Sequence, residues 1–244
     1  VFPVCSMIMY MPRGTILLLP AYHYMYKGES TMKIALINEN SQAAKNSMIC
    51  ENLKKIVEPM GHEVFNYGMY TAEDETQLTY VMCGLLSAIL LNSKAADYVV
   101  TGCGTGEGAM LACNSFPGVL CGHIVDVEDA YMFAQINDGN AIAMPFAKGF
   151  GWGAELHLQY VFEKLFGCES GGGYPKERVI PEQRNKKILD EVKKITHTDM
   201  MTILKNIDQD FLKTAISGEK FQEYFFANCQ VPEIAEYLKS VLNA

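Results

Sequence analysis

Short apolar segments alternate with amphipathic segments between residues 33 and 166, and this alternation strongly limits how the chain can fold. The apolar segments have strand length, and those between them carry apolar residues at helical spacing. Parallel strands joined by right-handed helical crossovers form a sheet that helices cover on both faces. We therefore predict an α/β fold with a parallel five-stranded sheet, its strands at residues 33–37, 63–67, 97–101, 118–124 and 140–144.

Helical segments are predicted between these strands and beyond them, at residues 41–58, 74–92, 109–114, 127–136 and 153–166. Three consecutive glycines at 171–173 interrupt the pattern. From about residue 181 only helical segments follow, at 182–196, 199–207, 209–216, 220–228 and 232–242. The sequence thus predicts an α/β domain at 32–180 and a C-terminal helical extension at 181–244. The aromatic residues of the extension are expected to pack rather than bind a ligand: Phe221, Tyr224, Phe225 and Phe226.

Residues 1–31 differ in composition from the rest of the chain. They are rich in Met, Tyr and Pro, and Arg13 is the only charge before a short apolar patch at 16–19. A signal peptide would need a longer apolar region. The segment Lys27-Gly28-Glu29 can instead be encoded by purine-rich bases of the kind that precede a bacterial start codon, and Met32 follows closely. We therefore interpret residues 1–31 as a translated leader or other non-native segment, with Met32 as the natural start.

Charge and cysteine content exclude several classes of partner. The net charge of −8, the pI near 5.2 and the lack of a Lys/Arg-rich cluster argue against nucleic acid. No apolar run approaches the ~18 residues that span a bilayer, which argues against a membrane. The eight cysteines show neither a CxxC pair nor zinc-like spacing. We therefore expect reduced thiols, no cysteine-based zinc site and a cytoplasmic location.

Residues 101–108 read Thr-Gly-Cys-Gly-Thr-Gly-Glu-Gly, directly after the third predicted strand and before a helix. Such a turn presents backbone N–H groups at the positive end of a helix dipole, which suits an anion. Cys103 and Glu107 add a thiol and a carboxylate that can move protons, and a helix N-terminus can activate a cysteine. Stabilisation of an anion beside a proton carrier is what enolate and enediolate chemistry needs.

The spacing of this loop excludes other familiar sites. A P-loop requires lysine after its last glycine, and Glu107 follows Gly106. A dinucleotide-binding fingerprint follows the first strand rather than the third. A cysteine phosphatase holds phosphate with an arginine six positions after its cysteine, where this chain has Ala109. A tight structural turn around a buried, inert cysteine is the alternative interpretation.

Four segments, in this order, resemble the ribose-5-phosphate isomerase B and galactose-6-phosphate isomerase family. They are Gly-Cys-Gly-Thr-Gly at 102–106, Asn-Ser-Phe-Pro-Gly at 114–118, Asn-Asp-Gly-Asn at 137–140, and Gly-Gly at 172–173 with Arg-Val at 178–179. The resemblance covers residues 33–179. It implies a Rossmann-like sheet and an aldose–ketose isomerase without metal or cofactor, acting on a pentose, a hexose or a sugar phosphate. It also implies a homodimer or homotetramer with sites at the subunit interface.

The resemblance assigns proton transfer to the glycine loop. Cys103 stands where many members place the base that moves a proton between C1 and C2, and Glu107 stands where another branch uses a glutamate. We favour Cys103 because the surrounding sequence matches the cysteine branch. The loop amides would hold the enediolate oxygens, at Gly104, Thr105, Gly106 and Gly108.

Two further residues match the family outside the loop. Asn137 corresponds to an asparagine near the substrate oxygens. Arg178 corresponds to a phosphate-binding arginine that reaches into the neighbouring subunit. The resemblance therefore predicts that each pocket uses residues of both subunits.

The chain also departs from the family at the expected site. The Asp-His pair after the first strand is Glu39-Asn40, which we still place at the substrate. Ile136 replaces the ring-opening histidine, and Tyr174 replaces the first phosphate-binding arginine. Fewer cations weaken the case for a phosphorylated sugar. Loss of that histidine suggests either a substrate that is already open-chain or another group that opens the ring. His123 could approach the site, although a histidine satisfied by packing is more common.

Two other functions stay open at this point. The missing cations are compatible with a non-catalytic sugar-binding or regulatory protein on the same scaffold, because a fold does not determine function. A cysteine-dependent enzyme of unrelated chemistry is the weaker alternative. Turnover of a sugar separates the isomerase from both.

Overall fold

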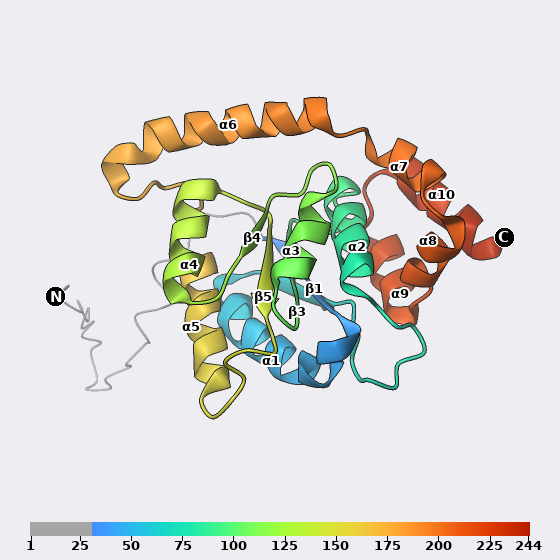
Figure 1. Cartoon of the computed structure of the whole chain (residues 1–244), viewed down its shortest axis with the longest axis horizontal. Coiled ribbons are helices and arrows are strands. Elements are labelled where there is room, and N and C mark those ends of the chain that lie inside the picture. Colours follow the sequence, from blue (N-terminus) through green and yellow to red (C-terminus); the bar gives the residue numbers. More distant parts are fainter. Residues whose placement is uncertain (1–30) are drawn as a thin grey trace, which may run out of the picture.

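Five parallel strands form the centre of the molecule, in the order β2-β1-β3-β5-β4 (Figure 1). This computed structural model describes residues 31–244, so the interpretation of the preceding segment as a leader concerns residues outside the described range, Thr31 excepted. The strands are β1 (Lys33–Asn38), β2 (Glu63–Asn66), β3 (Tyr98–Cys103), β4 (Cys121–His123) and β5 (Ala141–Pro145). Every pairing is parallel, which confirms the predicted sheet.

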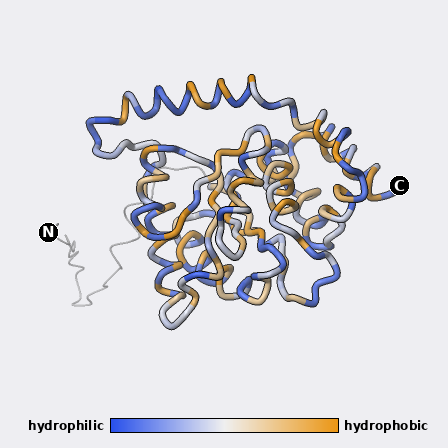
Figure 2. The backbone as a smooth tube through the Cα atoms, viewed as in Figure 1, coloured by the Kyte–Doolittle hydropathy of each residue, from blue (hydrophilic) through white to orange (hydrophobic). Residues whose placement is uncertain are grey.

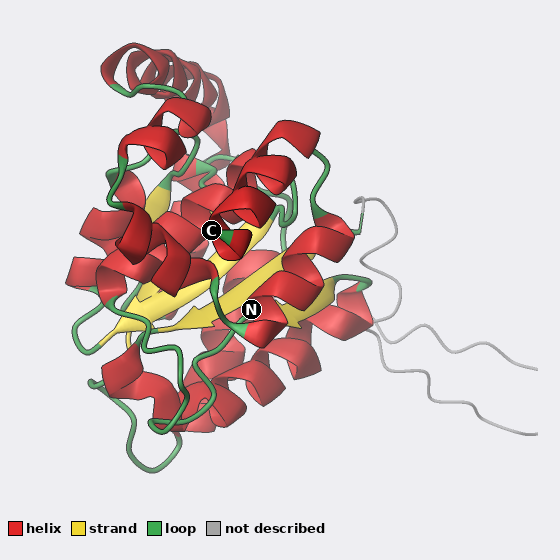
Figure 3. Cartoon of the chain, turned by 90° about the vertical axis from the view of Figure 1, so that its right-hand side faces the viewer, coloured by secondary structure: helices red, strands yellow, loops and turns green. Residues whose placement is uncertain are grey.

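Helices cover both faces of this sheet, as Figure 3 shows. Along β1, Ile34 and Leu36 point to one face while Ala35 and Ile37 point to the other, because side chains alternate along a strand. The first face packs on α1 (Asn46–Val57), α4 (Val127–Met132) and α5 (Ala154–Phe166), and the second on α2 (Tyr80–Asn92) and α3 (Glu107–Asn114). Strands buried on both sides explain their nearly continuous apolar sequence.

The C-terminal extension is helical, as predicted, and packs on the face formed by α2. After α6 (Val179–Thr196) it contains α7 (Met200–Asn206), α8 (Gln209–Ile216), α9 (Glu219–Asn228) and α10 (Pro232–Asn243). Phe221 and Phe225 are buried and stacked, with ring centroids 5.2 Å apart. Their rings extend the core that includes Tyr67, which confirms the expectation that these aromatic residues pack.

The helix predicted at 74–92 begins only at Tyr80. The carboxylate of Asp74 accepts hydrogen bonds from the backbone N–H groups of Tyr70, at 2.6 Å, and Thr71, at 3.2 Å, and so closes a turn. Thr79 caps the helix by accepting from the Met82 N–H at 3.3 Å. Leu78 matched the helical spacing of apolar residues because its side chain is buried, but the residue belongs to the loop before α2.

Two other predicted helices are divided. A 3-10 helix at Asn40–Lys45 precedes α1, and a π-helical turn at Phe133–Asn137 follows α4. Each irregular turn contains a residue that the sequence assigned to the site, Asn40 in the first and Asn137 in the second. Strand β4 is also shorter than predicted, since the segment at 118–120 enters the sheet as a loop.

Helix α6 presents its apolar side away from the molecule, as Figure 2 shows by its orange outer edge. The helix contains no buried residue, and Ile195 is 84% exposed. The exposed apolar side chains of this outer face are Ile180, Ile188, Leu189, Val192 and Ile195. Within residues 31–244, no helix is both long and apolar enough to cross a membrane.

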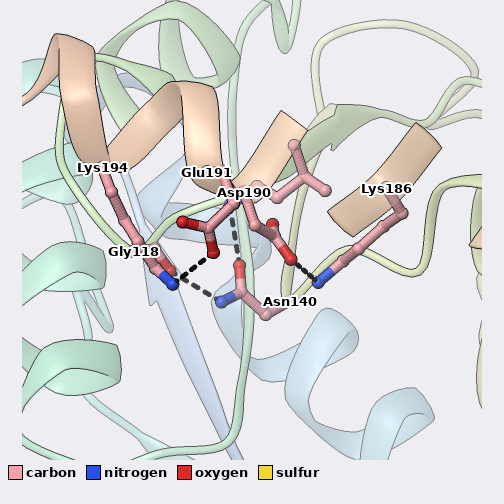
Figure 4. A network of polar contacts seen from close by, with 7 residues as sticks. Gly118, Asn140, Lys186, Asp190, Glu191 and Lys194 are labelled. Carbon is pink, nitrogen blue, oxygen red and sulfur yellow. Dashed lines mark hydrogen bonds and ion pairs between the residues drawn. The ribbon is translucent and has the colours of Figure 1, made fainter. Parts of the chain in front are cut away.

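The polar side of α6 faces the body of the protein. Lys186 pairs with Asp190 at 2.7 Å beneath the helix (Figure 4). Lys193 donates to the backbone carbonyls of Asn114, at 3.3 Å, and Val119. This orientation reverses that of an ordinary surface helix, whose apolar side covers its own core.

Replacing Tyr67 with phenylalanine is expected to stabilise the protein. The Tyr67 hydroxyl is buried and, within the described residues, lacks a hydrogen-bond partner; burial also raises its pKa, so it stays protonated. Removing this unsatisfied group should add about 1 kcal/mol to the free energy of unfolding. Thermal unfolding should show a Tm about 2–4 °C higher for a domain of this size.

The matched control is Tyr237→Phe, because the Tyr237 hydroxyl is hydrogen-bonded to Gln209 at 3.0 Å and to the Leu204 carbonyl at 3.3 Å. That variant should be less stable than the wild type. An equal loss of stability in Tyr67→Phe would show that its hydroxyl has a partner in solution.

Candidate active site

The carboxyl ends of β1 and β3 lie side by side at the point where the strand order reverses. Asn38 is paired with Gly102, and the two strands continue into Glu39 and Cys103. On the other side of β3, Cys103 is paired with Pro145 of β5. Ligands of open parallel sheets bind at such a switch point, outside the carboxyl ends of the strands. The fold thus brings Glu39 and the glycine loop together.

Close packing explains two of the loop glycines. A Cβ on Gly102 would lie 2.5 Å from the Phe146 ring and against the Met144 carbonyl oxygen. Gly106 has a φ of +81°, which disfavours other residues, and a Cβ there would lie 2.8 Å from the His123 ring. These contacts fix the path of the chain from β3 into α3.

Cys103 lies at the base of this loop and is 7% exposed. Its Sγ accepts a hydrogen bond from the Gly106 N–H at 3.3 Å. The thiol therefore faces a backbone donor and the first turn of α3, whose initial N–H groups have no partner within the helix. These backbone donors favour a negatively charged ligand group beside the sulfur.

Glu107 occupies a different environment, since it is the first residue of α3 and its side chain is exposed. Thr105 is also exposed, Gly104 is partly exposed, and Gly108 lies against the Tyr80 ring. The two candidate bases thus share one loop but differ in burial. The buried thiol is shielded from water and the carboxylate is not.

Glu39 is only 8% exposed, and its Oε2 accepts a hydrogen bond from Ser41 Oγ at 2.8 Å. The Asn40 N–H donates to the Leu78 carbonyl at 2.7 Å, which ties this segment to the loop before α2. A carboxylate held beside the thiol could accept a proton from a substrate hydroxyl.

Two neighbours of the loop complete its surroundings. Cys83 is fully buried in the same apolar cluster as Cys103, and burial raises its pKa well above the ordinary value, so this thiol stays neutral. His123 Nε2 donates to the Thr105 carbonyl at 2.9 Å. The histidine for which the sequence favoured a packing role therefore does contact the glycine loop.

Lys45 is a charged residue at this edge that the sequence analysis missed. Its Nζ donates to Gln42 Oε1 at 2.8 Å and to the Phe146 carbonyl. No motif marks this lysine, because it ends an irregular 3-10 turn where the sequence predicted a continuous helix. Only the path of that turn brings it beside β5.

The structure does not bring Asn137 and Arg178 to the glycine loop within one chain. Asn137 precedes β5, whereas Cys103 is paired with the last residue of β5. The length of β5, roughly 13 Å, therefore separates Asn137 from the glycine loop. Arg178 precedes α6, its side chain is 62% exposed, and its Nε lies 3.7 Å from a Glu182 oxygen. Both residues belong to the amino edge of the sheet.

Two cavities also lie at the amino edge, beneath α6, with volumes of about 250 and 420 Å³. They share Asp138, Asn140 and Lys186, and the glycine loop lines neither of them. Within residues 31–244, no three His, Cys, Asp or Glu side chains are grouped so that they could hold a metal ion.

Comparison with known proteins gives consistent matches across the described chain. A family model described as ribose/galactose isomerase matches residues 34–166, and one described as ribose-5-phosphate isomerase matches residues 195–241. A solved 4-deoxy-L-threo-5-hexosulose-uronate ketol-isomerase, complexed with a tartrate, is 68% identical. The match covers 87% of this chain and 100% of that one, with a TM-score of 0.86.

Two further solved structures are similar to this chain at lower sequence identity. A ribose-5-phosphate isomerase from Vibrio parahaemolyticus is 53% identical over the same shares of both chains, with a TM-score of 0.84. The type B ribose 5-phosphate isomerase of Trypanosoma cruzi is 20% identical, covers 66% of this chain and 97% of its own, and has a TM-score of 0.55. The last match supports the fold alone.

Proposed function

Because the chain belongs to the ribose/galactose isomerase family and is thus an aldose–ketose isomerase, we propose that its substrate is an open-chain 4-deoxy-5-hexosulose uronate. The observation that carries this proposal is the 68% identity to a ketol-isomerase of such a uronate. Two departures from the family support it. Ile136 stands in place of the ring-opening histidine, and Tyr174 in place of a phosphate-binding arginine.

In the proposed reaction, Cys103 as thiolate removes the proton from the hydroxyl-bearing carbon next to the aldehyde. The electron pair moves into the new C–C double bond, and the carbonyl oxygen becomes an enediolate oxygen that the loop N–H groups stabilise. A proton passes between the two oxygens, and we assign this transfer to Glu39, whose buried carboxylate lies on the segment that follows β1. Cys103 then returns its proton to the former aldehyde carbon, so the reaction needs no oxidant or metal.

The active form in this proposal is a homodimer. The exposed apolar face of α6 would be covered by a second copy, which removes an apolar surface from water. The partner's Asn137 and Arg178 would then complete the pocket, since within one chain both lie at the edge opposite Cys103. The amino edge of one copy would thereby meet the carboxyl edge of the other.

The purified enzyme should isomerise 4-deoxy-L-threo-5-hexosulose uronate with a kcat/KM at least about 100-fold above that for ribose 5-phosphate. NMR of the product mixture measures both reactions directly. Tartrate should inhibit competitively, because it resembles part of the open-chain acid. Preference for the phosphorylated pentose would refute the proposed substrate, and saturable binding without turnover would favour the sugar-binding alternative.

A further inference from the structure

Lys45 carries a positive charge that no carboxylate of the described residues neutralises directly. Its ammonium contacts one amide oxygen, one backbone carbonyl and the face of Phe150, whose ring centroid lies 4.7 Å away. The described ion pairs do not include it. Desolvation lowers the pKa of Lys45, as expected for a partly buried cation without a counter-charge. An anion bound nearby would compensate the charge of this ammonium group.

The position of Lys45 connects it to the glycine loop. Phe146, whose carbonyl accepts from Lys45, donates its own N–H to the Cys103 carbonyl at 2.9 Å. Gln42, the other acceptor, lies against Gly104, with Nε2 3.9 Å from the position of a Cβ there. The ammonium is therefore held at the rim of the site that contains Cys103, between the segments that follow β1 and β5.

A chain of hydrogen bonds leads from Lys45 to Glu39. Lys45 donates to Gln42, Gln42 Nε2 donates to Ser41 Oγ at 3.0 Å, and Ser41 donates to Glu39. Two neutral side chains thus keep the cation and the carboxylate apart. The site is polarised, with a negative group near the thiol and a positive group further along the rim.

We propose that Lys45 binds the substrate carboxylate and selects acidic open-chain sugars over neutral ones. This inference rests on the proposed function, which supplies a substrate with one carboxylate. Gln42 and Phe146 accept two of the three ammonium N–H groups, so one donor is left for a carboxylate oxygen. A single lysine is a point charge that suits one carboxylate, whereas phosphate recognition usually recruits several donors.

The test compares Lys45→Met with the wild type in steady-state turnover of the uronate. The variant should raise KM about 30-fold and change kcat less than about 3-fold, because the lost contact binds ground state and transition state alike. Lys45→Arg, which keeps the charge, should recover most of the affinity. Lys148→Met is the matched control, since it removes an exposed lysine from the segment after β5, close in sequence to Phe146, and its KM should stay within about 2-fold.

A pair of inhibitors separates charge from packing. Gluconate, an open-chain six-carbon acid, should inhibit the wild type competitively, and glucitol, which lacks the carboxylate, should inhibit far less. Lys45→Met should raise the inhibition constant of gluconate about 30-fold and leave that of glucitol unchanged. An unchanged gluconate constant would overturn the role of Lys45, as would equal weakening of both inhibitors.

Failure of the proposed function gives a different result from failure of this inference. If the wild type does not turn over the uronate, the proposed substrate is wrong, and direct titration with gluconate still measures whether Lys45 binds a carboxylate. If the wild type is active and Lys45→Met keeps its KM, only the inference fails. Thermal unfolding of Lys45→Met and Lys45→Arg shows whether either variant has lost its fold.

Discussion

Replacing Cys103 with alanine is expected to lower kcat/KM by about 100- to 10,000-fold, the usual contribution of a general base. The thiol is buried at the end of β3 and accepts the Gly106 N–H, whereas Glu107 projects from α3 into solvent. Glu107→Gln should therefore cost less than about 10-fold. The difference reflects position, since a base must reach the reacting carbon in a site from which water is excluded.

Exchange of the substrate's C1 and C2 protons with deuterated water measures this step without relying on net turnover. Cys103→Ala should show no exchange above background, and Glu107→Gln should keep it. Cys168→Ala, which removes an exposed free thiol, is the control for general loss of cysteine. Unchanged proton exchange in both loop variants would rule out the proposed mechanism. Loss of proton exchange in Glu107→Gln alone would mean that Glu107, rather than Cys103, is the base.

The sheet and the glycine loop could be predicted from sequence because their signals are local. Strands buried on both faces give short apolar runs, and the order of helix and strand fixes parallel pairing. Gly102 and Gly106 occur where close packing or a positive φ demands glycine, so the loop was visible in the residues alone. Its position at the carboxyl end of β3 then followed from the topology.

Other features depended on interactions that no short segment reveals. Asp74 closes a turn with its side chain, so the predicted helical start at 74 was wrong although Leu78 had the right spacing. Lys45 reaches β5 only because the chain enters α1 through a 3-10 turn. Helix α6 has an amphipathic pattern, but a pattern does not say whether its apolar side faces its own core or another molecule.

That outward apolar side predicts that two inactive variants can restore each other's activity. A mixed dimer pairs one Cys103→Ala subunit with one subunit of the double variant Asn137→Ala and Arg178→Ala. Such a dimer would contain one pocket in which all of these residues are intact. At equal amounts, random pairing in a two-fold dimer gives activity near a quarter of the wild type. Each variant alone should remain nearly inactive, because all of its pockets lack a required group.

The experiment mixes the two variants under conditions that allow subunit exchange and follows turnover of the uronate. Adding Ile188→Asp and Ile195→Asp to both partners should prevent recovery, since burying these carboxylates at the interface is costly. Sedimentation of that combination should show monomers, whereas the parent protein should sediment as a dimer. A fully active monomer, or a dimer whose mixed variants stay inactive, would mean that each pocket is built from one chain.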